Sequence, residues 1–204
     1  MASKILTTHV GSLPRSKQLS ELLFSKDKKE SYDEKEFKEI VKQNVEEVVK
    51  KQLNIGIDFI SDGEMSKISY ATYVKDRISG FSGESERKTP ADLEDFPEYM
   101  TKIAKSGGTP SYTRPCCTSD LAIQDTESLK DDVANLNNAI KKNNHSNAFM
   151  NAASPGVINV FMPNKFYQND DEYLEKLSDL MSSEYEYIIS NNLQLQIDCP
   201  DLAL

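Results

Sequence analysis

Hydrophobic positions recur at helical spacing between Asp33 and Leu53, with glutamates and lysines between them. The apolar positions are Phe37, Ile40, Val41, Val45, Val48, Val49 and Leu53. Their spacing of three and four residues predicts an amphipathic helix that buries one face. Asn54-Ile55-Gly56 can end this helix with a left-handed residue, and residues 57–61 then predict a short buried strand that leads into Asp62-Gly63-Glu64.

The same order of helix, tight turn and strand is predicted twice more. One apolar stripe comprises Leu129, Val133, Leu136 and Ile140, and the other comprises Leu174, Leu177, Met181, Tyr185 and Ile188. Each stripe ends in an asparagine pair, at 143–144 or 191–192, and asparagine tolerates the left-handed conformation better than most residues. Strands are predicted after these turns at 148–152 and 193–197, and two further strands at 5–10 and 112–118.

Five strands separated mostly by helices favour parallel pairing through right-handed crossovers, so the predicted fold class is α/β. The stretch at about 79–110 is rich in Gly, Ser, Glu and Lys, with a weak helical segment at 96–104. We expect this stretch to be a long insertion between a strand and a helix that covers the active-site end. With 204 residues, of which 38% are hydrophobic, the chain can bury a sizeable core, and we expect residues 1–204 to form a single domain.

Charge and hydropathy exclude several kinds of partner. The net charge of −9 argues against nucleic acid, whose phosphates require concentrated Lys and Arg. The first residues lack the apolar stretch of a signal peptide, and no run approaches the roughly 18 apolar residues that span a bilayer. We therefore expect a cytoplasmic protein without a membrane partner.

The cysteines and histidines do not predict a metal site. Three cysteines, two of them adjacent at Cys116 and Cys117, do not form a disulfide framework, and we expect these two to be reduced thiols of the core. No second Cys or His pair lies at ligand spacing, so we assign no metal ligand in this chain. Walker, Rossmann and nucleophile-elbow motifs are also missing from the sequence.

Polar residues follow every predicted strand, and in a parallel barrel such strand ends converge on one face. They stand at 8–12, 62–64, 118–120, 151–156 and 198–201. Gly11-Ser12 offers backbone amides for a carboxylate or phosphate, or forms an ordinary turn. Glu64 and Asp198 could hold a substrate ammonium, or could cap a helix or hydrogen-bond a loop. His9 could act as an acid, a base or a hydrogen-bond donor, or could be a satisfied histidine at a strand end.

Five of these motifs, taken together and in this order, resemble the catalytic domain of cobalamin-independent methionine synthase and its shorter relatives. They lie at 7–15, 61–65, 111–114, 151–156 and 194–202. That family has a (β/α)₈ barrel and transfers a methyl group from a methyltetrahydrofolate donor to the thiol of homocysteine, which a zinc ion activates. The resemblance therefore implies a methyltransferase and a partial (β/α)₈ TIM barrel, with about five parallel strands and four crossovers.

The resemblance also implies roles for individual residues. The amino acid's carboxylate would be held by Val10, Gly11 and Ser12, and its ammonium by Glu64 and Asp198. Residues near the methyl donor would be Ser111, Tyr112 and Arg114. The family's zinc ligands lie on later strands, so zinc is expected in the complete family enzyme but with no ligand in this chain.

Just over half of a barrel leaves strand edges open. We expect the remainder to come from a longer chain, from a second chain or from a homodimer. Three alternatives stay open for the function. They are a non-catalytic amino-acid-binding subunit, a related thiol alkyltransferase that uses another donor or coenzyme M, and a metal-free barrel similar to uroporphyrinogen decarboxylase.

Overall fold

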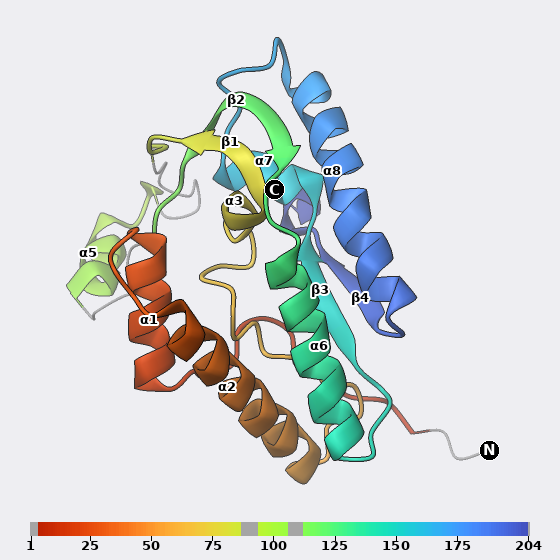
Figure 1. Cartoon of the computed structure of the whole chain (residues 1–204). Helices are drawn as coiled ribbons and strands as arrows, with labels where there is room; N and C mark the ends of the chain where they lie inside the picture. Colours follow the sequence, from red (N-terminus) through yellow and green to blue (C-terminus); the bar gives the residue numbers. More distant parts are fainter. Residues whose placement is uncertain (1–3, 87–93, 106–111, 204) are drawn as a thin grey trace.

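The structure, a computed structural model, describes residues 4–86, 94–105 and 112–203 and has a mixed α/β architecture (Figure 1). Its helices are α1 (Lys17–Asp27), α2 (Glu34–Asn54), α3 (Val74–Arg77), α5 (Pro97–Lys105), α6 (Glu127–Lys142), α7 (Pro155–Phe161) and α8 (Asp170–Ser190), with a 3₁₀ helix at Pro200–Ala203. Its strands are β1 (Ile78–Ser82), β2 (Cys116–Ile123), β3 (Phe149–Ala153) and β4 (Gln194–Asp198). None of the described helices is both long and apolar enough to cross a membrane.

The three long helices predicted from the apolar stripes are confirmed as α2, α6 and α8. Asp33 caps α2 by accepting hydrogen bonds from the N–H groups of Lys35 and Glu36, at 2.8 and 3.0 Å. The predicted left-handed turns are also present, since φ is 84° at Gly56, 51° at Asn144 and 61° at Asn192. Local sequence was therefore sufficient to predict these three helices and the turns that end them.

Four segments of the chain lie side by side in parallel. β3 pairs with β4 in register from Phe149–Gln194 to Ala153–Asp198. On its other side this segment meets Ile60 through a parallel bridge to Ala148, and the neighbouring Phe59 makes a parallel bridge to Thr8. The predicted strands at 148–152 and 193–197 are confirmed, whereas those at 5–10 and 57–61 are reduced to isolated bridges.

The expected set of five parallel strands is not confirmed, because the strand predicted at 112–118 appears as β2 and pairs with neither β3 nor β4 within the described residues. The observed β2 pairs antiparallel with β1, from Ile78–Ile123 to Ser82–Cys116, with an irregularity between Ser79 and Phe81. Strand periodicity determines which side chains share a face, but it does not determine the direction of the partner strand. The expected insertion at about 79–110 thus begins with an unpredicted strand, and residues 87–93 and 106–111 lie outside the described part.

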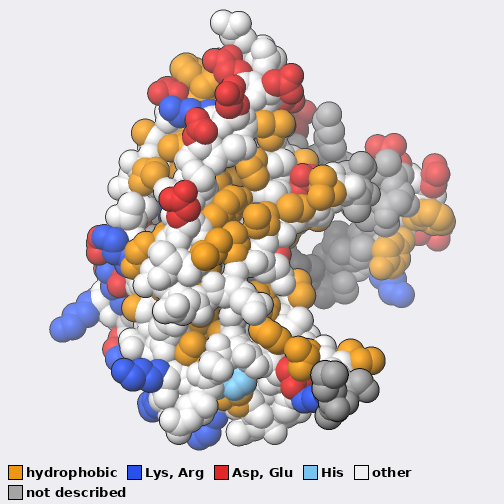
Figure 2. All heavy atoms as spheres, turned by 90° about the vertical axis from the view of Figure 1, so that its right-hand side faces the viewer, with side chains coloured by type: hydrophobic (Ala, Val, Ile, Leu, Met, Phe, Trp, Pro, Cys, Tyr) orange, Lys and Arg blue, Asp and Glu red, His pale blue; other side chains and the backbone are white. Residues whose placement is uncertain are grey.

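The core lies between the parallel segments and the long helices. All five residues of β3 are buried, and α2 and α6 lie side by side in front of them (Figure 1). On the side of α8 and β4, apolar side chains form a band on the surface (Figure 2). Ile189 of α8 and Ile197 of β4 are 59% and 43% exposed, which agrees with the position of β4 at the edge of its described sheet.

Candidate functional site

The carboxyl ends of the parallel segments bring Glu64 and Asp198 together through one side chain, that of Asn151. Asn151 Nδ2 donates to Glu64 Oε1 and to Asp198 Oδ2, each at 2.8 Å. The two carboxylate oxygens are therefore at most twice that length apart. Residues separated by 134 positions in the sequence thus form one acidic pair, as the convergence of strand ends predicted.

Each oxygen of this acidic pair accepts one hydrogen bond from a neutral side chain. Ser12 Oγ donates to Glu64 Oε2 at 2.5 Å, and Gln196 Nε2 donates to Asp198 Oδ1 at 2.9 Å. The remaining two oxygens accept from Asn151. Because a carboxylate oxygen has two lone pairs, every oxygen of the pair retains capacity for a further donor.

Backbone conformation places Glu64 in this arrangement. Its φ of 58° lies in the left-handed region, which costs a residue with a Cβ about 1 kcal/mol or more. The Glu64 N–H donates to Asp62 Oδ1 at 3.0 Å, and Leu13 N donates to the Gly63 carbonyl at 3.1 Å. Together these bonds hold the 62–64 turn against the loop after residue 10. Glu64 is 2% exposed.

Arg15 connects the same loops from the other side. Its Nη2 donates to the carbonyl oxygens of Glu64 and Lys67, at 2.9 and 2.7 Å. Burial lowers the pKa of Arg15, and the nearby carboxylates of Glu64 and Asp62 act against this decrease. Because its hydrogen bonds go to backbone carbonyls, Arg15 stabilises the turn without closing a side-chain ion pair with Glu64.

Backbone donors lie beside the acidic pair. The N–H groups of Gly11 and Ser12 make no hydrogen bond within the described residues, and φ is 83° at Gly11. The Ser12 side chain contacts Glu64, so these two donors are close to the acids. Val10 is 66% exposed, and the His9 ring has no hydrogen-bond partner in the described part of the chain.

An aromatic cluster surrounds the predicted donor-side residues. Arg114 Nη2 donates to the Tyr112 hydroxyl at 3.2 Å, and the guanidinium lies 4.7 Å from the centre of the Phe161 ring. Phe161 in turn meets Tyr70 edge to face, with ring centres 5.5 Å apart. Burial raises the pKa of Tyr70; Tyr112, Asp198 and Glu64 raise it further, and the Arg114 charge acts against them. Ser111 lies outside the described residues.

The described residues do not fit a zinc site. Within the described ranges, no three His, Cys, Asp or Glu side chains are grouped to hold a metal. Cys116 and Cys117 are buried, and burial raises the pKa of the Cys117 thiol to about 11, which disfavours the thiolate that binds zinc.

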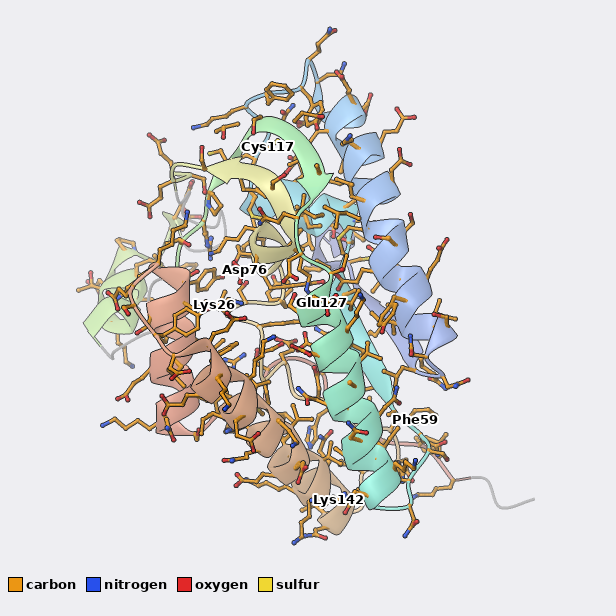
Figure 3. All side chains as sticks on the ribbon, viewed as in Figure 1. Lys26, Phe59, Asp76, Cys117, Glu127 and Lys142 are labelled. Atoms are coloured by element: carbon orange, nitrogen blue, oxygen red, sulfur yellow. The ribbon has the colours of Figure 1, made fainter. Side chains whose placement is uncertain are left out.

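One hollow of the described structure is lined by neither acid of the acidic pair. It has a volume of about 1730 Å³ and lies between α1, α2, α3 and α6. Neither Glu64 nor Asp198 lines it, whereas Lys26 and Asp76 do, and these two form an ion pair at 3.0 Å (Figure 3). The two acids selected from the motifs therefore lie at the strand ends and do not line this hollow.

Sequence reasoning missed three residues of the site. Arg15 and Asn151 stand inside the quoted motifs but had no assigned role, and Lys67 follows the 61–65 motif. Asn151 could have been selected as a polar residue within an otherwise apolar buried strand. Lys67 carried no signal, because a single lysine in a polar loop is normally exposed.

Comparisons with known proteins agree with this α/β architecture and with the motifs. Residues 5–90 match the family model described as the cobalamin-independent synthase catalytic domain. Over these residues, the match agrees with the resemblance that the motifs predicted. No curated protein matches the chain.

Two solved structures align with nearly the whole chain. A B12-independent methionine synthase from Shewanella sp. W3-18-1, in complex with selenomethionine, aligns with a TM-score of 0.67 and 16% identity, over 95% of this chain and 51% of that one. A putative vitamin-B12 independent methionine synthase from Listeria monocytogenes aligns with a TM-score of 0.56 and 16% identity, over 96% and 53%. These structures support a shared fold, and this chain spans about half of their length.

Proposed function

We propose that this chain holds the amino-acid substrate in a methyltransferase of the cobalamin-independent methionine synthase type. The substrate would be homocysteine, and its thiol would receive a methyl group to give methionine. The observation that carries the proposal is the bridge from Asn151, which holds the carboxylates of Glu64 and Asp198 beside one another.

The acidic pair suits a primary ammonium. Among the described residues, both carboxylates accept side-chain hydrogen bonds from neutral groups alone, so their negative charge has no cationic donor there. An ammonium group has three N–H donors and one positive charge, and charge-assisted hydrogen bonds are about twice as strong as neutral ones. The α-amino group of an amino acid provides this cation.

The free N–H groups of Gly11 and Ser12 suit the other end of the same ligand. Successive backbone N–H groups form an anion-binding site, and here they lie beside Glu64. One α-amino acid could therefore place its carboxylate at these amides and its ammonium at the acids. The selenomethionine bound by the Shewanella protein carries both groups.

The methyl donor is proposed to bind at the aromatic cluster of Tyr70, Tyr112, Arg114 and Phe161. Flat rings and a guanidinium are suitable for stacking against a planar ring such as a pterin. The choice of a methyltetrahydrofolate-type donor rests on the family resemblance. In that family zinc would activate the homocysteine thiol as its thiolate, and the described residues of this chain would bind and orient the amino acid.

The remaining strands of the barrel are proposed to lie beside β4. This strand forms one edge of its described sheet and exposes Ile197, and the similar solved structures are about twice as long as this chain. A longer chain, a second chain or a second copy could supply these strands.

Substitution of Asp198 by asparagine tests the amino-acid site. Asp198→Asn keeps the shape of the side chain but removes its charge, and we expect the affinity for L-homocysteine to fall by about 1.5–3 kcal/mol. Asp201→Asn is the matched control. The Asp201 carboxylate accepts a hydrogen bond from Ser154 Oγ at 2.8 Å and none from Asn151, which bridges the acidic pair. Calorimetry should show weaker binding only for Asp198→Asn, and unchanged binding would refute the site.

A further inference from the structure

Lys67 is a buried cation without a carboxylate in direct contact. It is 2% exposed, and no acidic oxygen of the described residues lies within ion-pair distance of its ammonium. Its Nζ donates to the backbone carbonyl of Asn151 at 2.5 Å and lies 4.4 Å from the centre of the Tyr73 ring. Because a buried ammonium is costly unless its donors are satisfied, this position calls for a physical reason.

The pairing of β3 explains why the Asn151 carbonyl accepts from a side chain. Even-numbered backbone groups here face β4, as Gln194 N donates to the Ala148 carbonyl at 3.1 Å. Odd-numbered groups face the segment at Ile60, whose N–H donates to Asn147 O and whose carbonyl accepts from Phe149 N.

Beyond Ile60 that neighbouring segment leaves the sheet, because Gly63 and Glu64 take left-handed conformations. The carbonyl of Asn151 therefore has no strand beside it on this side. Buried carbonyl groups require a partner, and the Lys67 ammonium provides one.

The same asparagine holds the acidic pair. Its backbone carbonyl accepts from Lys67, and its side-chain nitrogen donates to Glu64 and Asp198. The loop that carries Glu64 also carries Lys67, and Arg15 binds the backbone carbonyls of both. Lys67 thus joins this loop to β3 at the residue that bridges the two acids.

We propose that Lys67 is a positioning residue that orients Asn151 and thereby sets the separation of Glu64 and Asp198. Its role as an aid to amino-acid binding rests on the proposed function, whereas its action on Asn151 does not. Removal of Lys67 should release the Asn151 backbone, and the side-chain amide should then lose its alignment with at least one carboxylate.

A different role for Lys67 would be to neutralise the buried acids on its other side. Burial raises the pKa of Asp62 although the Lys67 charge acts against it, whereas burial of Glu184 is outweighed by the charges of Arg77 and Lys67, which lower its pKa. If this were its only role, its removal would lower stability but would leave the Asn151 side chain in place. The Asn151 amide therefore distinguishes the two roles.

The test uses nuclear magnetic resonance of the ¹⁵N-labelled protein. The side-chain amide of Asn151, identified by its loss in Asn151→Ser, should give two protons shifted and protected by their bonds to the carboxylates. Lys67→Met should move these resonances towards those of a free amide. Lys75→Met is the matched control, because Lys75 is also largely buried but contacts Asp27 and Thr113 instead.

Three results would overturn the proposal. In the unmodified protein, the Lys67 ε-methylene protons should give nuclear Overhauser effects to the Asn151 α-proton, and their absence would refute the contact even if Lys67→Met failed to fold. Unchanged Asn151 resonances in a folded Lys67→Met variant would refute the positioning role. Equal changes in Lys75→Met would show a general loss of stability instead.

Ligand binding separates this proposal from the proposed function. We expect Lys67→Met to bind L-homocysteine about tenfold more weakly than the parent protein, and Lys75→Met to bind like the parent. If the parent protein bound no L-homocysteine, the proposed function would fail. The resonances of Asn151 would still decide whether Lys67 positions it.

Discussion

Replacement of Arg77 by methionine should remove the central cation of a buried charge cluster. Arg77 is 7% exposed, and its two terminal nitrogens lie 2.6 Å from Asp132 Oδ2 and 2.8 Å from Glu184 Oε1. Tyr73 also donates to Glu184, at 2.7 Å. Although burial by itself lowers the pKa of Arg77, the two carboxylates raise it above its ordinary value, so the guanidinium remains charged.

The magnitude follows from what Arg77→Met leaves behind. Methionine fills much of the volume, but two carboxylates remain buried without their cation. Removing one partner of a buried ion pair costs about 3–5 kcal/mol, a large part of the roughly 5–15 kcal/mol that stabilises a domain. Urea unfolding followed by circular dichroism at neutral pH measures this loss.

Two further variants make the result for Arg77→Met decisive. Lys142→Met removes a surface ion pair between Lys142, which is labelled in Figure 3, and Glu46. This change should lower the free energy of unfolding by no more than about 1 kcal/mol. Adding Asp132→Asn and Glu184→Gln to Arg77→Met should restore part of the stability, because the uncompensated charges are removed. A loss from Arg77→Met as small as that from Lys142→Met would refute the reasoning.

Three other outcomes are expected. Burial raises the pKa of Asp62, so its contribution to stability is fully present below the pKa of unfolded aspartate and is lost as the pH rises through the folded pKa. Asp62→Asn should therefore gain stability relative to the parent as the pH rises above about 4, and a pH-independent difference in urea unfolding would contradict this. Iodoacetamide at about pH 8 should modify Cys199 before Cys117, because Cys199 is partly exposed and burial raises the pKa of the Cys117 thiol to about 11. Equal modification of the two cysteines, measured by peptide mass spectrometry, would contradict this. A Cβ at Gly156 would lie 2.0 Å from Asp201 Oδ2, so Gly156→Ala should lower the free energy of unfolding by about 1 kcal/mol, measured by thermal unfolding. An equal loss in the Asp201→Ala background would show that this contact is not the cause.

The acidic pair was predictable in its members but not in its construction. Glu64 and Asp198 each follow a predicted buried strand, and the convergence of parallel strand ends placed them together in advance. The amide of Asn151 that joins them, and the buried ammonium of Lys67 behind it, depend on where the neighbouring segment leaves the sheet. That departure involves backbone groups far apart in the sequence, so no local pattern signals it.

The sequence by itself determined the three long helices, the glycine and asparagine turns after them, and the strands β3 and β4. Helical periodicity, capping and tolerance of the left-handed conformation act over a few neighbouring residues. Only the tertiary structure decided that β2 pairs antiparallel with β1 and that Asn151 joins two acids. The physical reason is that strand direction and side-chain bridges are selected by contacts between distant segments. These contacts form only when burial of the common core brings the segments together.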